Sequence, residues 1–247
     1  MNRPVLLVIA HGSRDPRHAA TVQALVRRAG ALRPGARVET AFLDFNLPSV
    51  TGVLDRLAAE GIRDVVALPL LLTRAFHAKA DVPAVLRQAP PSLRIHQAEV
   101  LGPSPLLIAA VERRLYEAGL TPGDKSTTGV VLASAGSTDP EAIAVIAETA
   151  RELRRTGWCS VRPAFASASL PRTEDAVRAL RGDAGVRRVV VAPYVIAPGR
   201  LPDRIAAGAA DADVLADVLG PSPELARLLL ERYDGALATR VAVAHSA

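Results

Sequence analysis

Residues 5–16 read VLLVIAHGSRDP, and this stretch decides the fold. It begins with an unbroken apolar run that ends at Ala10, which is typical of a strand buried on both faces. Asp15 and Pro16 then supply an N-cap and a first-turn proline for a helix that we expect to reach Ala29. A buried strand that leads directly into a helix indicates an α/β fold with a parallel sheet.

The alternation of strands and helices continues through the first half of the chain. It predicts a four-stranded parallel sheet in the order 2-1-3-4, flanked by helices on both faces. The further predicted strands cover 38–43, 64–70 and 93–100, and the further predicted helices cover about 49–60, 82–88 and 105–118.

The second half of the chain repeats the first at a nearly constant offset. We therefore expect two tandem copies of one α/β domain with a cleft between them. The expected N-terminal domain covers 1–122 and the C-terminal domain covers 123–247, with a linker at 121–128. The aligned segments are 10–16 with 134–140, 65–69 with 189–193, and 101–105 with 219–223, where Leu-Gly-Pro-Ser-Pro is identical.

Two histidines differ between the copies. His11 directly follows the first strand, and His77 lies in the loop after the third strand. The second copy has Ala135 and Leu201 at these positions. The loops after strands 1 and 3 of such a sheet diverge at a switch point, where these folds bind ligands. We therefore expect the two imidazoles to face each other across a crevice, with the second copy forming a wall.

Other polar residues surround the predicted crevice. Gly12 allows a sharp turn after His11, and Ser13 can cap the helix or hydrogen-bond to an imidazole or a substrate carboxylate. Asp44 ends the second strand and can approach the same crevice, although acidic residues are common in loops. We assign no function to the remaining histidines, which are predicted on an exposed helix turn (His18), inside the fourth strand (His96) and in the tail (His245).

Basic residues are expected to ring one face of the protein. Arg14, Arg74, Arg172 and Arg200 stand in loops at the predicted strand ends. A polyanionic small molecule suits such a ring better than a nucleic acid does, because the chain has only 3% aromatic residues to stack on bases. We expect no nucleic-acid partner despite the net charge of +5.

The composition of the 247-residue chain excludes further classes of protein. A hydrophobic content of 49% suffices for a buried core. The apolar run at 5–10 is too short for a signal peptide or a membrane span, so we expect a soluble cytoplasmic protein with no membrane partner. A single cysteine, Cys159, excludes an internal disulfide framework and any multi-cysteine metal site.

The motifs around the two histidines resemble the sirohydrochlorin chelatase family, the class II chelatases, in its long two-domain form. The similar segments are the strand and His-Gly-Ser of 5–13, and Leu-Pro-Leu-Leu at 68–71 followed by His-Ala-Lys-Ala-Asp-Val-Pro at 77–83. The resemblance implies that His11 and His77 hold the divalent metal, Fe²⁺ or Co²⁺, that is inserted into sirohydrochlorin for sirohaem or cobalamin biosynthesis, with no organic cofactor. Short members of the family carry one copy and pair as homodimers, so we expect this chain to be a monomer. Some cobalt-handling relatives have a histidine-rich stretch, which this chain lacks, and this favours iron.

Metal insertion into a tetrapyrrole explains the residue types at the site. The ion must be held with open coordination positions, and a base must accept the pyrrole protons. Two neutral imidazoles suit Fe²⁺ or Co²⁺ and can accept a proton near neutral pH. Asp81 can orient His77 or relay the proton, or it can N-cap the helix that begins at Val82. The residues expected to bind the carboxylates of sirohydrochlorin are Ser13, Arg14, Arg74, Lys79 and Arg200.

Two other functions remain open. A non-catalytic carrier would bind the metal or the tetrapyrrole without accelerating insertion. A phosphotransfer enzyme would use His11 as a nucleophile, since histidine phosphatases also carry His-Gly after their first strand. Those enzymes have Arg-His-Gly, whereas Ala10 precedes His11 in this chain, so we expect no phosphatase activity.

Overall fold

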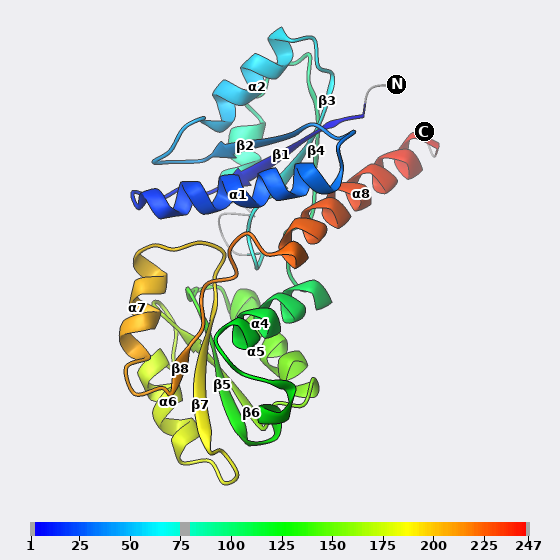
Figure 1. Cartoon of the computed structure of the whole chain (residues 1–247). Coiled ribbons are helices and arrows are strands. Elements are labelled where there is room, and N and C mark those ends of the chain that lie inside the picture. The colour runs from blue at the N-terminus through cyan, green and yellow to red at the C-terminus, as the bar shows by residue number, and fades with distance from the viewer. Residues whose placement is uncertain (1–2, 75–79, 246–247) are drawn as a thin grey trace. The chain divides into compact units, whose positions relative to one another are not determined.

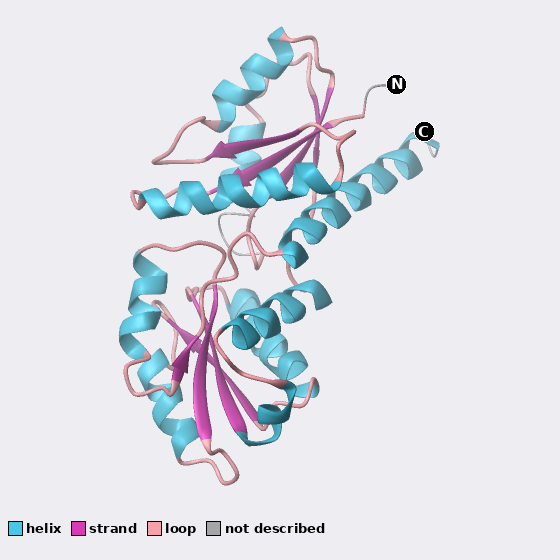
Figure 2. Cartoon of the chain, in the orientation of Figure 1, coloured by secondary structure: helices cyan, strands magenta, loops and turns pink. Residues whose placement is uncertain are grey.

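The computed structural model describes residues 3–74 and 80–245 (Figures 1 and 2). They form two four-stranded parallel sheets, ordered β2-β1-β3-β4 and β6-β5-β7-β8. The predicted fold class, a duplicated parallel sheet of order 2-1-3-4 flanked by helices, is confirmed. None of the helices in these two described ranges combines the length and apolar character that crossing a bilayer requires.

The first sheet has β1 at its centre, paired with β2 on one side and β3 on the other. Its helices lie on both faces, with α1 on one and α2 and α3 on the other (Figure 1). The strands are β1 (Val5–Ala10), β2 (Val38–Phe42), β3 (Asp64–Pro69) and β4 (Arg94–Gln97), and the helices are α1 (Pro16–Leu32), α2 (Val50–Ala59) and α3 (Val82–Leu86).

The second sheet repeats this arrangement around β5. Its strands are β5 (Thr128–Ser134), β6 (Ser160–Phe165), β7 (Arg188–Tyr194) and β8 (Val214–Leu215). The remaining helices of the chain are α4 (Pro105–Glu117), α5 (Pro140–Arg155), α6 (Thr173–Arg181), α7 (Arg200–Gly208) and α8 (Pro223–His245). The expected linker at 121–128 contains a 3₁₀ helix, η2 (Pro122–Thr127).

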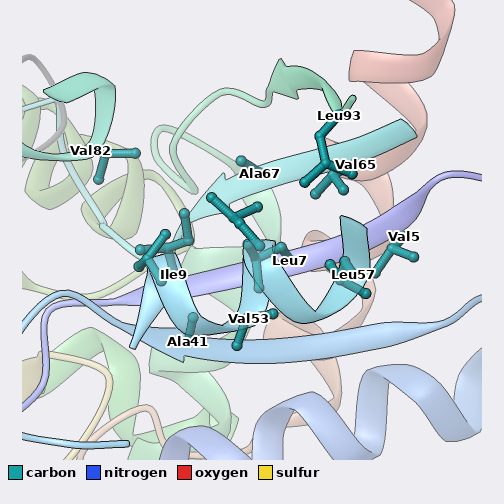
Figure 3. Close-up of a cluster of buried hydrophobic side chains, with 12 residues drawn as sticks. Val5, Leu7, Ile9, Ala41, Val53, Leu57, Val65, Ala67, Val82 and Leu93 are labelled. Carbon is teal, nitrogen blue, oxygen red and sulfur yellow. The ribbon is translucent and has the colours of Figure 1, made fainter. Parts of the chain in front are cut away.

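The core of the first sheet explains why its central strand is apolar throughout. Val5, Leu7 and Ile9 point to the face that α2 covers, where Val53 and Leu57 meet them (Figure 3). The alternate β1 residues are equally buried on the other face. Figure 3 also shows a residue of α3 in this core, Val82, which is 1% exposed. Its burial anchors the C-terminal end of the loop that carries His77.

The compact units do not coincide with the boundary expected between residues 122 and 123. One unit comprises 1–102 together with 221–247, and the other comprises 103–220. The difference arises because the last helix of each sequence copy packs in the unit of the other copy. Helix α4 contacts β7 and α5, whereas α8 contacts α1, β3 and β4 (Figure 1).

Polar contacts fix α8 to the first unit. Arg232 donates hydrogen bonds to the carbonyls of Val100 and Leu101 at 2.8 and 2.7 Å. The hydroxyl of Tyr233 is buried and donates to the carbonyl of Pro4 at 2.6 Å. Helix α8 therefore completes the unit that contains His11.

Replacing Tyr233 with phenylalanine is expected to lower the free energy of unfolding of the first unit by about 1–2 kcal/mol, because the carbonyl of Pro4 loses its buried donor. Urea unfolding of the two variants measures this. Asp234→Asn on the same helix is the control, since Asp234 pairs with Arg33 at the surface and its loss should cost about 0.5 kcal/mol. Equal effects of the two substitutions would contradict the anchoring role of Tyr233.

Candidate metal and substrate site

His11 lies at the carboxyl edge of the first sheet, directly after β1, and its side chain is exposed. Its carbonyl accepts a hydrogen bond from the backbone N–H of Asp44 at 2.9 Å, and the carbonyl of Ala10 accepts one from Leu43 at 2.9 Å. The loop after β2 is thereby tied to the loop after β1. This contact brings Asp44 beside His11, as the order of the strands predicts.

Gly12 makes this close approach possible. Its φ is +97°, and a Cβ atom at this position would lie 1.9 Å from the carbonyl oxygen of Asp44. Only glycine fits such a contact with another backbone. The turn that follows is also held by side chains, because the N–H of Ser13 donates to Asn46 Oδ1 at 2.8 Å. The hydroxyl oxygen of Ser13 accepts from the N–H of Asp15 at 3.1 Å, which holds the turn before α1, whereas the helix itself is capped by Asp15.

An aromatic side chain that the sequence analysis did not single out lies next to His11. The ring of Phe45 meets the imidazole edge-on, with the ring centroids 6.2 Å apart and an interplanar angle of 80°. The guanidinium carbon of Arg14 lies 5.2 Å from the centroid of the Phe45 ring. His11, Phe45 and Arg14 therefore form one exposed cluster, which combines an imidazole, an apolar surface and a cation.

His18 interacts electrostatically with His11, and it is less exposed than predicted. It was predicted on an exposed helix turn, but its side chain is half-buried on α1. Burial, together with the nearby positive charge that His11 can carry, lowers the pKa of His18 below its usual value. His18 therefore favours the neutral imidazole. His96 is partly buried on β4, where its Nε2 lies 3.5 Å from a carboxylate oxygen of Asp64.

The loop after β3 is described only at its two ends. His77 and Lys79 were predicted to bind the metal and the substrate, and both lie outside the described residues. Asp81 occupies the N-cap position of α3, but its side chain makes no capping hydrogen bond there. The capping alternative for Asp81 therefore lacks the hydrogen bond that defines it.

The predicted basic residues have different surroundings. Arg74 forms an exposed ion pair with Glu99 at 3.6 Å. An exposed pair of this kind contributes about 0–1 kcal/mol, so a substrate carboxylate can replace Glu99 at little cost. Arg200 is exposed at the first position of α7 in the second unit. Within the described ranges no group of three or more His, Cys, Asp or Glu side chains is arranged to hold a metal ion.

The second copy keeps the backbone of this site and lacks its side chains. Gly136 has a φ of +95°, and a Cβ there would lie 1.9 Å from the carbonyl oxygen of Ser167. The N–H of Ser167 donates to the carbonyl of Ala135 at 3.0 Å, as that of Asp44 does to His11. Ala168, with a φ of 60°, corresponds to Phe45, with a φ of 62°. The positions of His11, Asp44 and Phe45 are thus held by Ala135, Ser167 and Ala168.

Comparison with known proteins places these observations in a family. The model of the CbiX family matches residues 5–118 and 129–236, which are the two copies. A sirohydrochlorin cobaltochelatase of Priestia megaterium is 29% identical over 208 residues, which cover 81% of this chain and 66% of that protein, just under two thirds. A sirohydrochlorin ferrochelatase of Bacillus subtilis (strain 168) is 28% identical over 209 residues, covering 82% of this chain and 78% of that protein.

Solved structures agree on the fold. SirB from Bacillus subtilis with Fe³⁺ superimposes with a TM-score of 0.82 at 24% identity, over 97% of this chain and 98% of that chain. The SirB structure from Bacillus subtilis subspecies spizizenii in complex with cobalt has a TM-score of 0.76 at 22% identity. At this level of identity the likeness shows a shared fold.

Proposed function

Because the chain belongs to the CbiX family, we propose that it is a metal chelatase that inserts a divalent metal, Fe²⁺ or Co²⁺, into sirohydrochlorin. The family resemblance predicted from the sequence is confirmed by the match to both copies. Curated relatives named as a cobaltochelatase and a ferrochelatase support the reaction. The observation that carries the proposal is the difference between the copies. They share one loop geometry, but only the first places an imidazole and a carboxylate on it.

His11 and His77 are proposed to hold the ion before insertion. Two neutral imidazoles leave coordination positions open for the pyrrole nitrogens, and they bind Fe²⁺ and Co²⁺ less tightly than a closed thiolate site would. An ion held in this way can move into the macrocycle. The imidazoles do not select Fe²⁺ or Co²⁺ by themselves, because the affinities of such a site for divalent metals follow a general order that the metals set. The lack of a histidine-rich stretch leads us to propose iron.

Carboxylates near His11 are proposed to accept the pyrrole protons that the metal displaces. One oxygen of Asp44 accepts the N–H of Phe45 at 2.8 Å, which fixes the carboxylate in the loop beside His11. Asp81, four residues after His77 in the sequence, is the second candidate, either as an acceptor or by orienting His77. Each carboxylate can pass a proton to solvent after the transfer.

The basic residues are proposed to bind the peripheral carboxylates of sirohydrochlorin. Arg14 lies in the same cluster as His11, and Arg74 forms a weak surface ion pair with Glu99. Guanidinium groups suit carboxylates because they form paired hydrogen bonds with them. The proposed carboxylate contacts are Ser13, Arg14, Arg74, Lys79 and Arg200. We also propose that the protein is a monomer, since it carries two copies of the domain. Its proposed location is the cytoplasm.

An anaerobic absorbance assay with sirohydrochlorin tests the function. The protein should accelerate the spectral change of insertion well above the rate without protein, with Fe²⁺ and with Co²⁺ as alternative substrates. The ratio of the two rates gives the metal preference. Binding of sirohydrochlorin and metal with no rate above the spontaneous reaction would contradict the chelatase and favour the carrier.

A further inference from the structure

Phe45 occupies a position that the fold does not require to be aromatic. Its backbone has a φ of 62°, which bulky side chains rarely adopt, and its side chain is 50% exposed. Ala168 takes the same backbone conformation in the second copy, with a φ of 60°. The left-handed turn therefore belongs to the shared loop, whereas the ring is present only in the copy that carries His11.

The ring also lies where a ligand of His11 would be. It meets the imidazole edge-on at 6.2 Å, and Arg14 lies over it at 5.2 Å. Leu47, two residues further along the loop, is 81% exposed, but its counterpart Leu170 in the second copy is also 72% exposed, so the ring alone is specific to the first copy. A large apolar side chain that stays exposed to water contributes no burial energy to the folding of the protein. An apolar ligand surface would supply that burial.

We propose that Phe45 forms a platform for the flat face of the tetrapyrrole and positions the macrocycle beside His11. This inference rests on the proposed function. A planar conjugated macrocycle with carboxylates at its edge matches the cluster, because aromatic rings stack on Phe45 while a peripheral carboxylate pairs with Arg14. The contact sets where the pyrrole nitrogens lie relative to the ion, although Phe45 itself binds no metal.

Titration of metal-free sirohydrochlorin, followed by its own absorbance and fluorescence, tests the platform in the full-length protein. Phe45→Ala should weaken tetrapyrrole binding about tenfold, because a stacking contact and its buried area are lost. Binding of Co²⁺ alone should stay within about twofold, since the ligands of the ion are unchanged. Phe45→Trp should keep the affinity. Ala168 shows that the loop accepts alanine, and Phe45→Gly provides a second variant that suits the positive φ.

Leu32→Ala is the matched control. Leu32 is also 50% exposed, but it ends α1 and therefore lies at the opposite edge of the sheet from His11. Its replacement should leave tetrapyrrole binding unchanged. If Phe45→Ala and Phe45→Gly bind sirohydrochlorin as tightly as the unmodified protein, the platform is refuted.

The outcome separates this inference from the proposed function. Insertion by the unmodified protein with unchanged binding by Phe45→Ala would refute the platform and leave the chelatase standing. Tetrapyrrole binding that depends on Phe45, without any insertion, would refute the chelatase and support the platform. A protein that neither binds sirohydrochlorin nor inserts metal would refute both.

Discussion

Replacing His11 with alanine is expected to reduce metal insertion into sirohydrochlorin by at least about a hundredfold, and His77→Ala should do the same. Each substitution removes one of the two proposed imidazole ligands, so that the remaining one holds the ion weakly and in no fixed position. Tetrapyrrole binding should stay within a few-fold, because the basic residues and Phe45 are unchanged. Anaerobic absorbance assays measure insertion, and titration of metal-free sirohydrochlorin measures binding.

His96→Ala is the control for the loss of an imidazole elsewhere. His96 lies on β4 beside Asp64, and its removal should leave the insertion rate close to that of the unmodified protein. A His11→Ala variant that inserts metal at the full rate would exclude His11 from the mechanism. A variant that also fails to bind the tetrapyrrole would show that His11 acts on the substrate instead of the ion.

Gly12→Ala and Gly136→Ala are each expected to lower the free energy of unfolding of their own unit by about 3 kcal/mol or more. In both cases the new Cβ would lie 1.9 Å from a backbone carbonyl oxygen, so the loop must move, and the positive φ adds strain. The two effects should differ in their consequences. Gly12→Ala should also disrupt metal binding, since it separates the loops of His11 and Asp44, whereas Gly136→Ala should leave it intact.

Urea unfolding followed by circular dichroism, with Co²⁺ titration of the folded variants, checks both expectations. Gly30→Ala is the control, because Gly30 lies within α1 and has no atom within 4 Å of the added Cβ. That substitution should stabilise the protein by about 0.5–1 kcal/mol. If Gly12→Ala unfolds at the same urea concentration as the unmodified protein, the close approach of the two loops is wrong.

The strands and their parallel arrangement were predictable because each strand carries its own signal. The apolar run of β1 and the helix start at Asp15 and Pro16 indicate a parallel sheet from local chemistry alone. The exchange of α4 and α8 was not predictable in the same way. Both helices begin at the last proline of the same Leu-Gly-Pro-Ser-Pro segment, so the sequence around their starts does not say which sheet each one covers. Neighbouring elements usually pack together, which favours packing of each helix on the sheet of its own copy.

A candidate site residue could be predicted where a residue type that can bind or react stands directly after a strand. His11 follows a strand, and its replacement by Ala135 in the second copy predicts a functional role for it. Phe45 was missed because an aromatic residue in a loop has no periodicity and its contact with His11 depends on the left-handed turn. The sequence did hold a signal, since Ala168 replaces Phe45 in a loop of equal length that ends in the same Leu-Pro. The half-buried position of His18 was not predicted, because it depends on how other elements pack around α1.

X-ray absorption spectroscopy of the Co²⁺-loaded protein tests the central claim, that two imidazoles of the first copy hold the ion. The spectrum should show nitrogen or oxygen ligands at about 2.0–2.2 Å with the scattering pattern of two imidazole rings, and no sulfur ligand. The imidazole contribution should fall by half in His77→Ala. A spectrum without imidazole scattering, or one with a sulfur ligand from Cys159, would contradict the account.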